Sequence, residues 1–190
     1  MKWKRMMAVA AMLVAAVLAL SACDGQEAPA PEETAEQQVL FDVTRFIGVD
    51  EAGLVAIMGE PDGLTEYESD GKAKDYVYDN VSYTFNGEQG EFDHLTFFLR
   101  MAEDGTYIVK DLGIYFYYSI DKNEFFAIPA NTDIFALFGI NTDLTVSKEL
   151  PEWKIEKHEN VIDGINRITM IWNDKTDTEY LLVSISVGYD

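Results

Sequence analysis

Residues 50–61 read Asp-Glu-Ala-Gly-Leu-Val-Ala-Ile-Met-Gly-Glu-Pro. Asp50 is a good N-cap, because its carboxylate can accept a backbone N–H group of the first helical turn. Leu54 and Met58 recur at helical spacing. Gly59 favours the left-handed backbone that ends a helix, and the proline two residues later prevents its continuation. The stretch therefore predicts a short helix from Asp50 to Met58, followed by extended chain.

The chain after this helix alternates apolar and polar residues, which is typical of strands. Asn86-Gly87 is a strong signal for a tight hairpin turn. The aromatic run at 114–118 reads as a buried strand, and a flat binding surface is the alternative, because aromatic residues are enriched at interfaces. Strands are expected at residues 76–78, 81–85, 95–99, 107–109 and 114–118.

A similar pattern begins again at residue 131. A second helix is expected at 131–138, closed by Gly139, with strands at 153–158, 165–172 and 180–187. At a shift of 80 residues, 57–59 align with 137–139 and 64–65 align with 144–145. These patterns predict an α+β fold of two tandem units, each a short helix packed on an antiparallel β-meander. The first unit would span residues 39–118 and the second 119–190.

Phe46-Ile47-Gly48, followed by Val-Ala-Ile-Met-Gly-Glu-Pro at 55–61, resembles the opening of the SmpA/OmlA (BamE-like) domain family. Two such units in tandem are also the architecture of the β-lactamase-inhibitor proteins. The resemblance implies an α+β domain that presents a curved sheet to another protein. The second half departs from the motif, because Asn141 stands where the proline would be.

The N-terminus has the pattern of an export signal. Residues 1–5 carry three positive charges, and residues 6–20 are wholly apolar. Fifteen apolar residues are too few to span a bilayer comfortably, since a spanning helix needs about 20. A basic start and a short apolar core are typical of a signal peptide, here residues 1–22.

The end of this signal, Leu20-Ser21-Ala22-Cys23, resembles the lipobox of bacterial lipoproteins. The resemblance implies cleavage after Ala22 and a diacylglycerol on the sulfur of Cys23. The alternative is an ordinary signal peptide or an uncleaved signal anchor. Residues 24–38 hold two prolines and five acidic residues but no large apolar side chain, so 23–38 is interpreted as a lipidated cysteine with a disordered acidic linker.

The acidic charge of the chain disfavours some classes of binding partner. The formal net charge is −20, from 34 acidic and 14 basic residues, and three of the basic residues lie in the signal. Such a surface disfavours nucleic acid, which is bound through basic patches, and it also repels anionic lipid headgroups. The lipid on Cys23 would therefore be the link to the membrane. With Cys23 modified, no cysteine remains for a disulfide, so packing alone must stabilise the domain.

The sequence contains few candidate catalytic or metal-binding residues. His94 and His158 have no second histidine or cysteine at ligand spacing, so no metal site is expected. No nucleophile elbow, phosphate-binding loop or dinucleotide fingerprint occurs, and neither catalytic residues nor cofactors are expected. The oxygen-rich stretches 66–75 and 173–179 lack the spacing of an EF-hand loop, and whether they bind calcium stays open.

These observations favour a non-enzymatic protein-interaction module, lipid-anchored on the extracytoplasmic face of the cell membrane, whose partner is another envelope protein. The alternative is a small-ligand binding protein, or a carboxylate-based hydrolase, with a pocket between the two units. A third possibility is a surface or sensory module without enzymatic activity.

Overall fold

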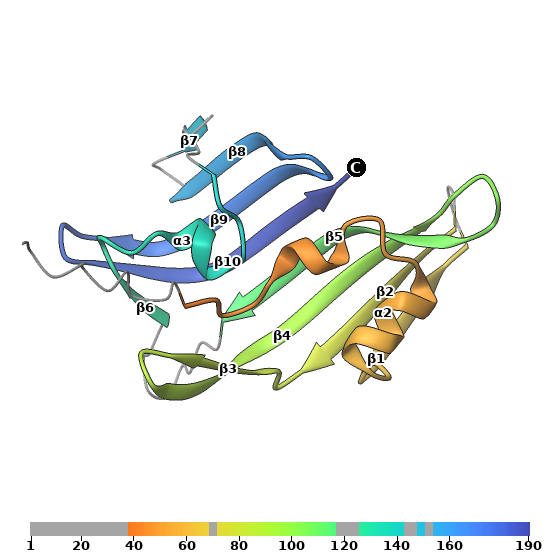
Figure 1. Ribbon diagram of the computed structural model, residues 1–190, viewed down its shortest axis with the longest axis horizontal. Helices are drawn as coiled ribbons and strands as arrows, with labels where there is room; N and C mark the ends of the chain where they lie inside the picture. The colour runs from red at the N-terminus through yellow and green to blue at the C-terminus, as the bar shows by residue number, and fades with distance from the viewer. Residues whose placement is uncertain (1–37, 69–71, 117–125, 143–147, 151–153) are drawn as a thin grey trace, which may run out of the picture. The chain divides into compact units, whose positions relative to one another are not determined.

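The computed structural model describes residues 38–190, apart from 69–71, 117–125, 143–147 and 151–153 (Figure 1). The described residues belong to one compact unit, Gln37–Asp190. The predicted signal peptide, most of the predicted linker and the boundary at 118/119 lie outside the described residues.

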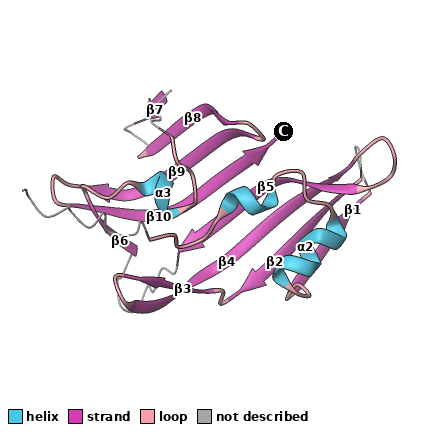
Figure 2. Cartoon of the chain, in the orientation of Figure 1, coloured by secondary structure: helices cyan, strands magenta, loops and turns pink. Residues whose placement is uncertain are grey.

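The described chain is mostly strand, with three short helical segments (Figure 2). The helical segments are η1 (Val43–Phe46, a 3-10 turn), α2 (Glu51–Met58) and α3 (Ile134–Leu137). The strands are β1 (Gly63–Tyr67), β2 (Ala73–Asp79), β3 (Ser82–Phe85), β4 (Glu88–Met101), β5 (Tyr107–Phe116), β6 (Phe126–Pro129), β7 (Lys148–Leu150), β8 (Ile155–Ile162), β9 (Ile165–Lys175) and β10 (Glu179–Tyr189).

All of these strands pair antiparallel. Eight described strands lie side by side in the order β1-β2-β4-β5-β10-β9-β8-β7, while β3 pairs with β4 and β6 pairs with β10. The centre of this order is the contact between β5 and β10, where Ser184 lies opposite Tyr115 and Gly188 lies opposite Asp111. One continuous sheet therefore contains strands from both halves of the chain.

The prediction of two tandem helix-on-meander units is wrong. The sheet is not divided between the halves, because β5 and β10 use their edges to pair with each other. Strand also outweighs helix throughout the described chain, so the fold is an antiparallel β-sheet with small helical additions rather than an α+β pair.

The second predicted helix also differs from expectation. It begins at Ile134 rather than at residue 131, because Asp133 caps it by accepting a hydrogen bond from the Ala136 N–H group. Phe138 has already left helical geometry, and Gly139 follows with φ +77°. Only one turn, α3, fits between this late start and this early end, so the second half has no counterpart to α2.

Local predictions in the first half are confirmed. Asp50 caps α2, its carboxylate accepting from the Gly53 N–H group at 2.7 Å, and Gly59 follows the helix with φ +88°. Asn86 and Gly87 connect β3 to β4 with positive φ angles of 51° and 83°, which is the backbone that a tight two-residue hairpin needs.

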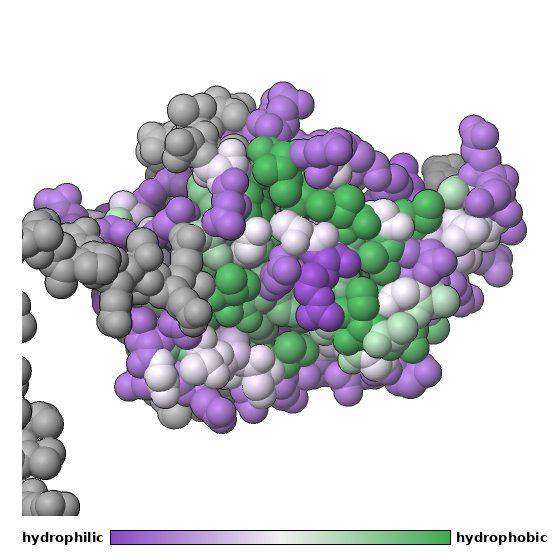
Figure 3. Space-filling model, viewed as in Figure 1, coloured by the Kyte–Doolittle hydropathy of each residue, from purple (hydrophilic) through white to green (hydrophobic). Residues whose placement is uncertain are grey.

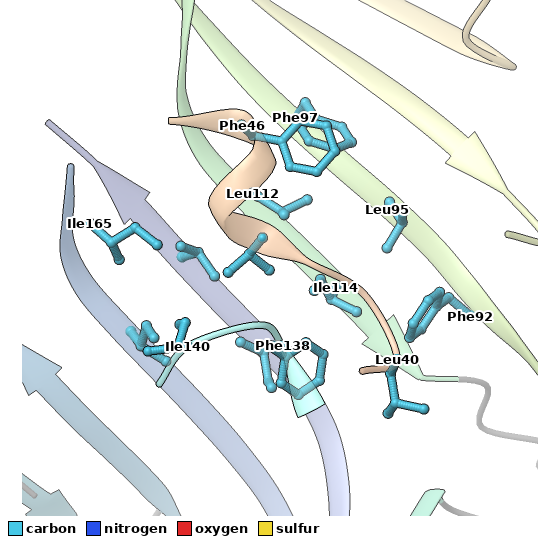
Figure 4. Close-up of a cluster of buried hydrophobic side chains, with 14 of the residues drawn as sticks. Leu40, Phe46, Phe92, Leu95, Phe97, Leu112, Ile114, Phe138, Ile140 and Ile165 are labelled. Atoms are coloured by element: carbon cyan, nitrogen blue, oxygen red, sulfur yellow. The ribbon is translucent and has the colours of Figure 1, made fainter. Parts of the chain in front are cut away.

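The hydrophobic core lies between the sheet and the segment that leads from Leu40 through η1 (Figure 4). Phe46 packs on Phe97 of β4, with ring centroids 4.7 Å apart. At the other end of this segment, the Leu40 N–H group donates to the Leu137 carbonyl, and the Tyr189 hydroxyl donates to the Val43 carbonyl. The segment thus ties strands from both halves into one core.

The helices and this segment lie on one face of the sheet (Figures 1 and 2). The space-filling view of this face shows hydrophobic areas interrupted by polar residues (Figure 3). No described helix covers the opposite face, which we call the open face.

Candidate functional site

The open face is formed by every second residue of the central strands. Leu95, Phe97, Leu112 and Ile114 are buried against the helical side. Because side chains alternate along a strand, the residues between them point the other way. The open face of the four central strands therefore carries His94, Thr96, Phe98 and Arg100 from β4, Asp111, Gly113 and Tyr115 from β5, Ser184, Ser186 and Gly188 from β10, and Arg167, Thr169 and Ile171 from β9.

Gly188 allows an ion pair to form across a strand. Arg167 on β9 and Asp111 on β5 both lie opposite Gly188 on β10. The Arg167 guanidinium crosses over the glycine and donates from Nη2 to Asp111 Oδ1 at 2.7 Å. A Cβ at position 188 would lie 3.2 Å from that guanidinium and 2.9 Å from Asn166 Oδ1, so a larger residue would crowd this bridge.

Gly113 has a similar role for an aromatic side chain. The Tyr115 ring lies back over this glycine, where a Cβ would come within 2.8 Å of the ring. On its other side the ring stacks on His94, with centroids 4.2 Å apart and an interplanar angle of 18°. His94 Nδ1 lies 2.9 Å from Asp93 Oδ2. Tyr115 is thereby held flat while 39% of its surface stays exposed.

Two depressions in the open face share Arg167 as a lining residue. The first, of about 320 Å³, lies among Phe98, Arg100, Lys110, Asp111, Arg167 and Gly188. The second, of about 230 Å³, lies among Tyr115, Lys157, Arg167, Thr169, Ile171 and Ser186. We call the two together the basic trough. Its floor follows β10, whose open-face residues, Ser184, Ser186 and Gly188, are all small.

The trough differs in charge from the rest of the chain. Four of the fourteen Lys and Arg residues line it, namely Arg100, Lys110, Lys157 and Arg167, against one of the 34 acidic residues, Asp111. A chain with a net charge of −20 therefore has a locally positive surface here. Such a concentration of cations raises the local concentration of anionic groups.

Asp111 is the one carboxylate in this setting. Burial raises its pKa and outweighs the opposing effects of Arg167 and Arg100, which favour the charged carboxylate. Arg100 also lies against the neighbouring Phe98, with its guanidinium carbon 5.9 Å from the ring centroid. Asp111 holds the Arg167 guanidinium in place, and a planar guanidinium has the geometry that binds carboxylates.

The sequence predicted only part of this site. In the run at 114–118, Ile114 and Phe116 are buried, as predicted for a strand against the core, while Tyr115 faces outward; residues 117 and 118 lie outside the described part. Leu20, Ser21, Ala22 and Cys23 also lie outside it. No pattern in the sequence indicated the Arg167–Asp111 bridge. The one available signal was the run of small residues at alternate positions 184, 186 and 188.

The two histidines lie on different strands and opposite faces. His94 is on the open face, while His158 on β8 is buried, with Nε2 4.0 Å from Glu156 Oε2 and its ring against Phe135. Lys175 binds the same Glu156 carboxylate. Among the described residues, no group of three or more His, Cys, Asp and Glu side chains is placed to hold a metal ion.

The two oxygen-rich stretches are mainly strand ends. The first joins β1 to β2, with 69–71 outside the described residues, and the second forms the turn between β9 and β10. Regarding membranes, none of the helices in the described part of the chain has the length and hydropathy of a membrane-spanning helix.

Comparison with known proteins gives no match: no family model, no curated protein and no solved structure matches this chain. The function of the open face is therefore inferred from its own geometry and chemistry.

Proposed function

We propose that this protein is a lipid-anchored, extracytoplasmic module of the cell envelope that binds another protein through the open face. The anchor is Cys23, and the preceding Leu20, Ser21 and Ala22 resemble a lipobox. Two acyl chains give stable attachment, whereas one gives only marginal binding. The acidic surface of the domain does not favour contact with anionic headgroups, so the lipid anchor is what holds the domain at the membrane.

The observation that carries the binding function is a pair of pre-positioned side chains on a sheet face that no described helix covers. Tyr115 is held between Gly113 and His94, and Arg167 is held over Gly188 by Asp111. Tyrosine and arginine are among the residues that contribute most to protein interfaces. Because these two are fixed before a partner arrives, little side-chain entropy is lost on binding.

A second candidate is a small-ligand binding protein that uses the first depression, which draws residues from β4, β5, β9 and β10 and so from both halves. A carboxylate-based hydrolase needs two carboxyl groups flanking the scissile bond. Asp111 is the only carboxylate among the residues lining the two depressions. The charge of the trough favours binding of an anionic group over hydrolysis.

The anchor is tested by mass spectrometry of the mature N-terminus. We expect a peptide that begins at Cys23 and carries a diacylglycerol. A Cys23→Ser variant should lose the lipid and leave the membrane fraction. An unmodified cysteine, or a mature chain that begins elsewhere, would contradict the anchor.

The binding function is tested by photo-crosslinking in the source cells. A photoreactive amino acid at Tyr115 reports on the open face, and the same amino acid at exposed Ala52 on α2 reports on the helical face. We expect Tyr115 to give one defined adduct with an envelope protein and Ala52 to give none. The absence of any adduct at Tyr115, or the same diffuse set of adducts at both positions, would contradict an interaction module.

A further inference from the structure

We infer that the basic trough receives an extended, acidic segment of the partner protein. This inference rests on the proposed function and deepens it, because it names the chemistry that the open face recognises. Its ligand is a short run of Asp or Glu residues with an apolar or aromatic residue at one end.

The basic trough contains positive charges that an acidic ligand can bind. Within the described residues, Arg100 and Lys157 take part in no ion pair, so no carboxylate of the described part of the chain holds their charged groups. Lys110 donates to the backbone oxygen of Asp190, and Arg167 holds Asp111. Arg100 lines the first depression, and Lys157 lines the second.

The shape of the trough suits an extended peptide. Its floor on β10 runs from Ser184 to Gly188, a length of about 13 Å for a strand. An extended peptide of four or five residues has the same length, and its alternate side chains lie about 7 Å apart. Carboxylates at alternate positions could therefore meet cations along the trough, with the small residues of β10 beneath the peptide backbone.

The end of the trough near the second depression adds specificity. Tyr115 and Ile171 are both more than a third exposed there, at 39% and 38%. An apolar or aromatic side chain beside the acidic run would cover both. Arginine forms two parallel hydrogen bonds with a carboxylate, so the other end favours a planar acid over a point charge.

The surroundings of the trough select a segment rather than a large anionic surface. Asp75 lies opposite Phe98 on one side, and Glu159 lies opposite Arg167 on the other. A second copy of this chain also carries a charge of −20, and a broad anionic membrane would meet these flanking acids. A narrow acidic segment reaches the cations and avoids both.

The inference is tested on the full-length lipidated protein in detergent by titration with unlabelled hexaglutamate at low ionic strength. The backbone amide signals of Gly113 and Gly188 report binding in the trough, and that of Gly59 on the helical side is the internal control. We expect saturable shifts at the two open-face glycines, little change at Gly59, and weaker binding as salt is added. Hexaglutamine should produce no shift.

Substitutions of individual charged residues test which side chains bind hexaglutamate. Arg100→Gln with Lys157→Gln should weaken hexaglutamate binding about tenfold or more, since each charge-assisted hydrogen bond is strong enough for such a change. Arg45→Gln, which removes an exposed cation of η1 on the helical face, should change it less than about twofold. Asp111→Asn should strengthen binding, because it removes the one carboxylate of the trough and frees Arg167.

Equal losses for Arg45→Gln and the trough variant would show non-specific attraction and overturn the inference, as would the absence of shifts at Gly113 and Gly188. Shifts at these glycines with phosphatidylglycerol vesicles but not with hexaglutamate would assign the trough to lipid phosphates instead. In cells, an unchanged Tyr115 adduct in the Arg100→Gln, Lys157→Gln variant would overturn the acidic ligand but leave the proposed function standing. Loss of that adduct, with folding intact, supports both.

Discussion

Two glycines shape the open face by the side chains they lack. Without a Cβ at 113 and 188, Tyr115 and Arg167 lie flat against the sheet rather than projecting from it. Neither glycine has a positive φ, so backbone freedom is not the reason for their presence. The reason is space, and the space is used by the two side chains that the proposed binding function needs.

We therefore predict a selective effect of Gly113→Ala. The added Cβ would lie 2.8 Å from Tyr115, and the flexible tyrosine side chain can swing away from it. The free energy of unfolding should fall by no more than about 1 kcal/mol, while the stack between Tyr115 and His94 is lost. The ring-proton chemical shifts of His94 measure that stack by NMR.

Gly63→Ala is the matched control. It also places a Cβ on an open-face strand position, but at an ordinary 3.5 Å from Val77. It should leave the His94 signals unchanged. Unchanged His94 signals in Gly113→Ala would mean that the glycine does not position Tyr115.

The sequence predicted these residue-level features of the open face only in part. The alternation of Ile114, Tyr115 and Phe116 indicated that one face of a strand is buried, and it left the outward residue as a candidate contact. Arg167 and Asp111 are 56 positions apart, and their bridge depends on both strands pairing with β10. No local pattern contains that information, because strand pairing is set by the tertiary fold.

At the scale of elements, β2 holds helix α2 at both ends. The Tyr76 hydroxyl donates to Glu51 in the first turn, and Lys74 Nζ lies 2.6 Å from the same carboxylate. The Tyr78 hydroxyl donates to the Gly59 carbonyl, just past the last turn, at 3.1 Å. An eight-residue helix is marginal alone, so these contacts, with buried Leu54, fix it on the sheet.

Glu51→Gln tests the first of these contacts. Burial alone would raise the pKa of Glu51, but the hydrogen bonds from Lys74 and Tyr76 lower it below the ordinary 4.5. The stability that this carboxylate contributes is therefore present above pH 4.5 and is lost as the pH falls below it. The variant should be less stable than wild type by about 1 kcal/mol at neutral pH.

The measurement is urea denaturation at several pH values from neutral to acidic. The difference in stability between wild type and Glu51→Gln should shrink as the pH falls through 4.5. Glu60→Gln, an exposed acid just beyond the same helix, should show little difference at any pH. A difference that stays constant with pH would argue against a charged Glu51 as the contact.

Tyr76 and Tyr78 should make the stability of the fold depend on pH at the alkaline end of the scale. Burial, then the hydrogen bond to Glu51, raises the pKa of Tyr76 to about 12. Burial, then the charges of Glu60 and Asp62, raises the pKa of Tyr78 to about 12. The unfolded chain ionises near 10, so the stability linked to these hydroxyls is complete below pH 10 and is lost as the pH rises toward 12.

Thermal unfolding followed by circular dichroism between about pH 9 and 12 measures this loss. In the Tyr76→Phe, Tyr78→Phe variant the melting temperature should be lower at neutral pH but should fall less steeply above pH 10. Tyr67→Phe removes an exposed hydroxyl whose pKa is raised by its hydrogen bond to Asp75, so this variant should change the slope less than the double variant does. Equal slopes in all three proteins would contradict the linkage.

Sequence reasoning was most successful at this scale where a cap residue marks the boundary. Asp50 and Gly59 delimit α2, and Asn86-Gly87 turns β3 into β4, because these residues act on backbone groups within four positions. The predicted start of the second helix was wrong, because the helix begins at Ile134, after its cap Asp133, and not at residue 131. Where that helix begins depends on packing that the local sequence does not contain.

At the scale of the whole domain, the β5–β10 pairing decides the architecture. The repeated pattern at a shift of 80 residues suggested separate units, and each half does contribute a run of neighbouring strands to the sheet. Yet Tyr115 and Ser184 lie opposite each other although 69 positions separate them. The buried residues of both halves then form one cluster beneath the segment from Leu40 through η1.

A single sheet and a single core predict one cooperative unfolding transition. The three tryptophans are Trp3, in the predicted signal, and Trp153 and Trp172, both in the second half. Fluorescence of the mature chain therefore reports on the second half alone. Leu95, on β4 in the first half, is fully buried, and Leu95→Ala should destabilise the fold by about 2–5 kcal/mol.

In urea, the tryptophan transition of Leu95→Ala should move to lower denaturant together with the far-UV circular dichroism transition, because the core is shared. Leu64→Ala removes the same atoms from a side chain that is 50% exposed, and it should move neither transition appreciably. If the halves unfolded independently, Leu95→Ala would shift only part of the circular dichroism signal. The tryptophan midpoint would then stay at its wild-type value, and the joining of the halves through β5 and β10 would contribute nothing to stability.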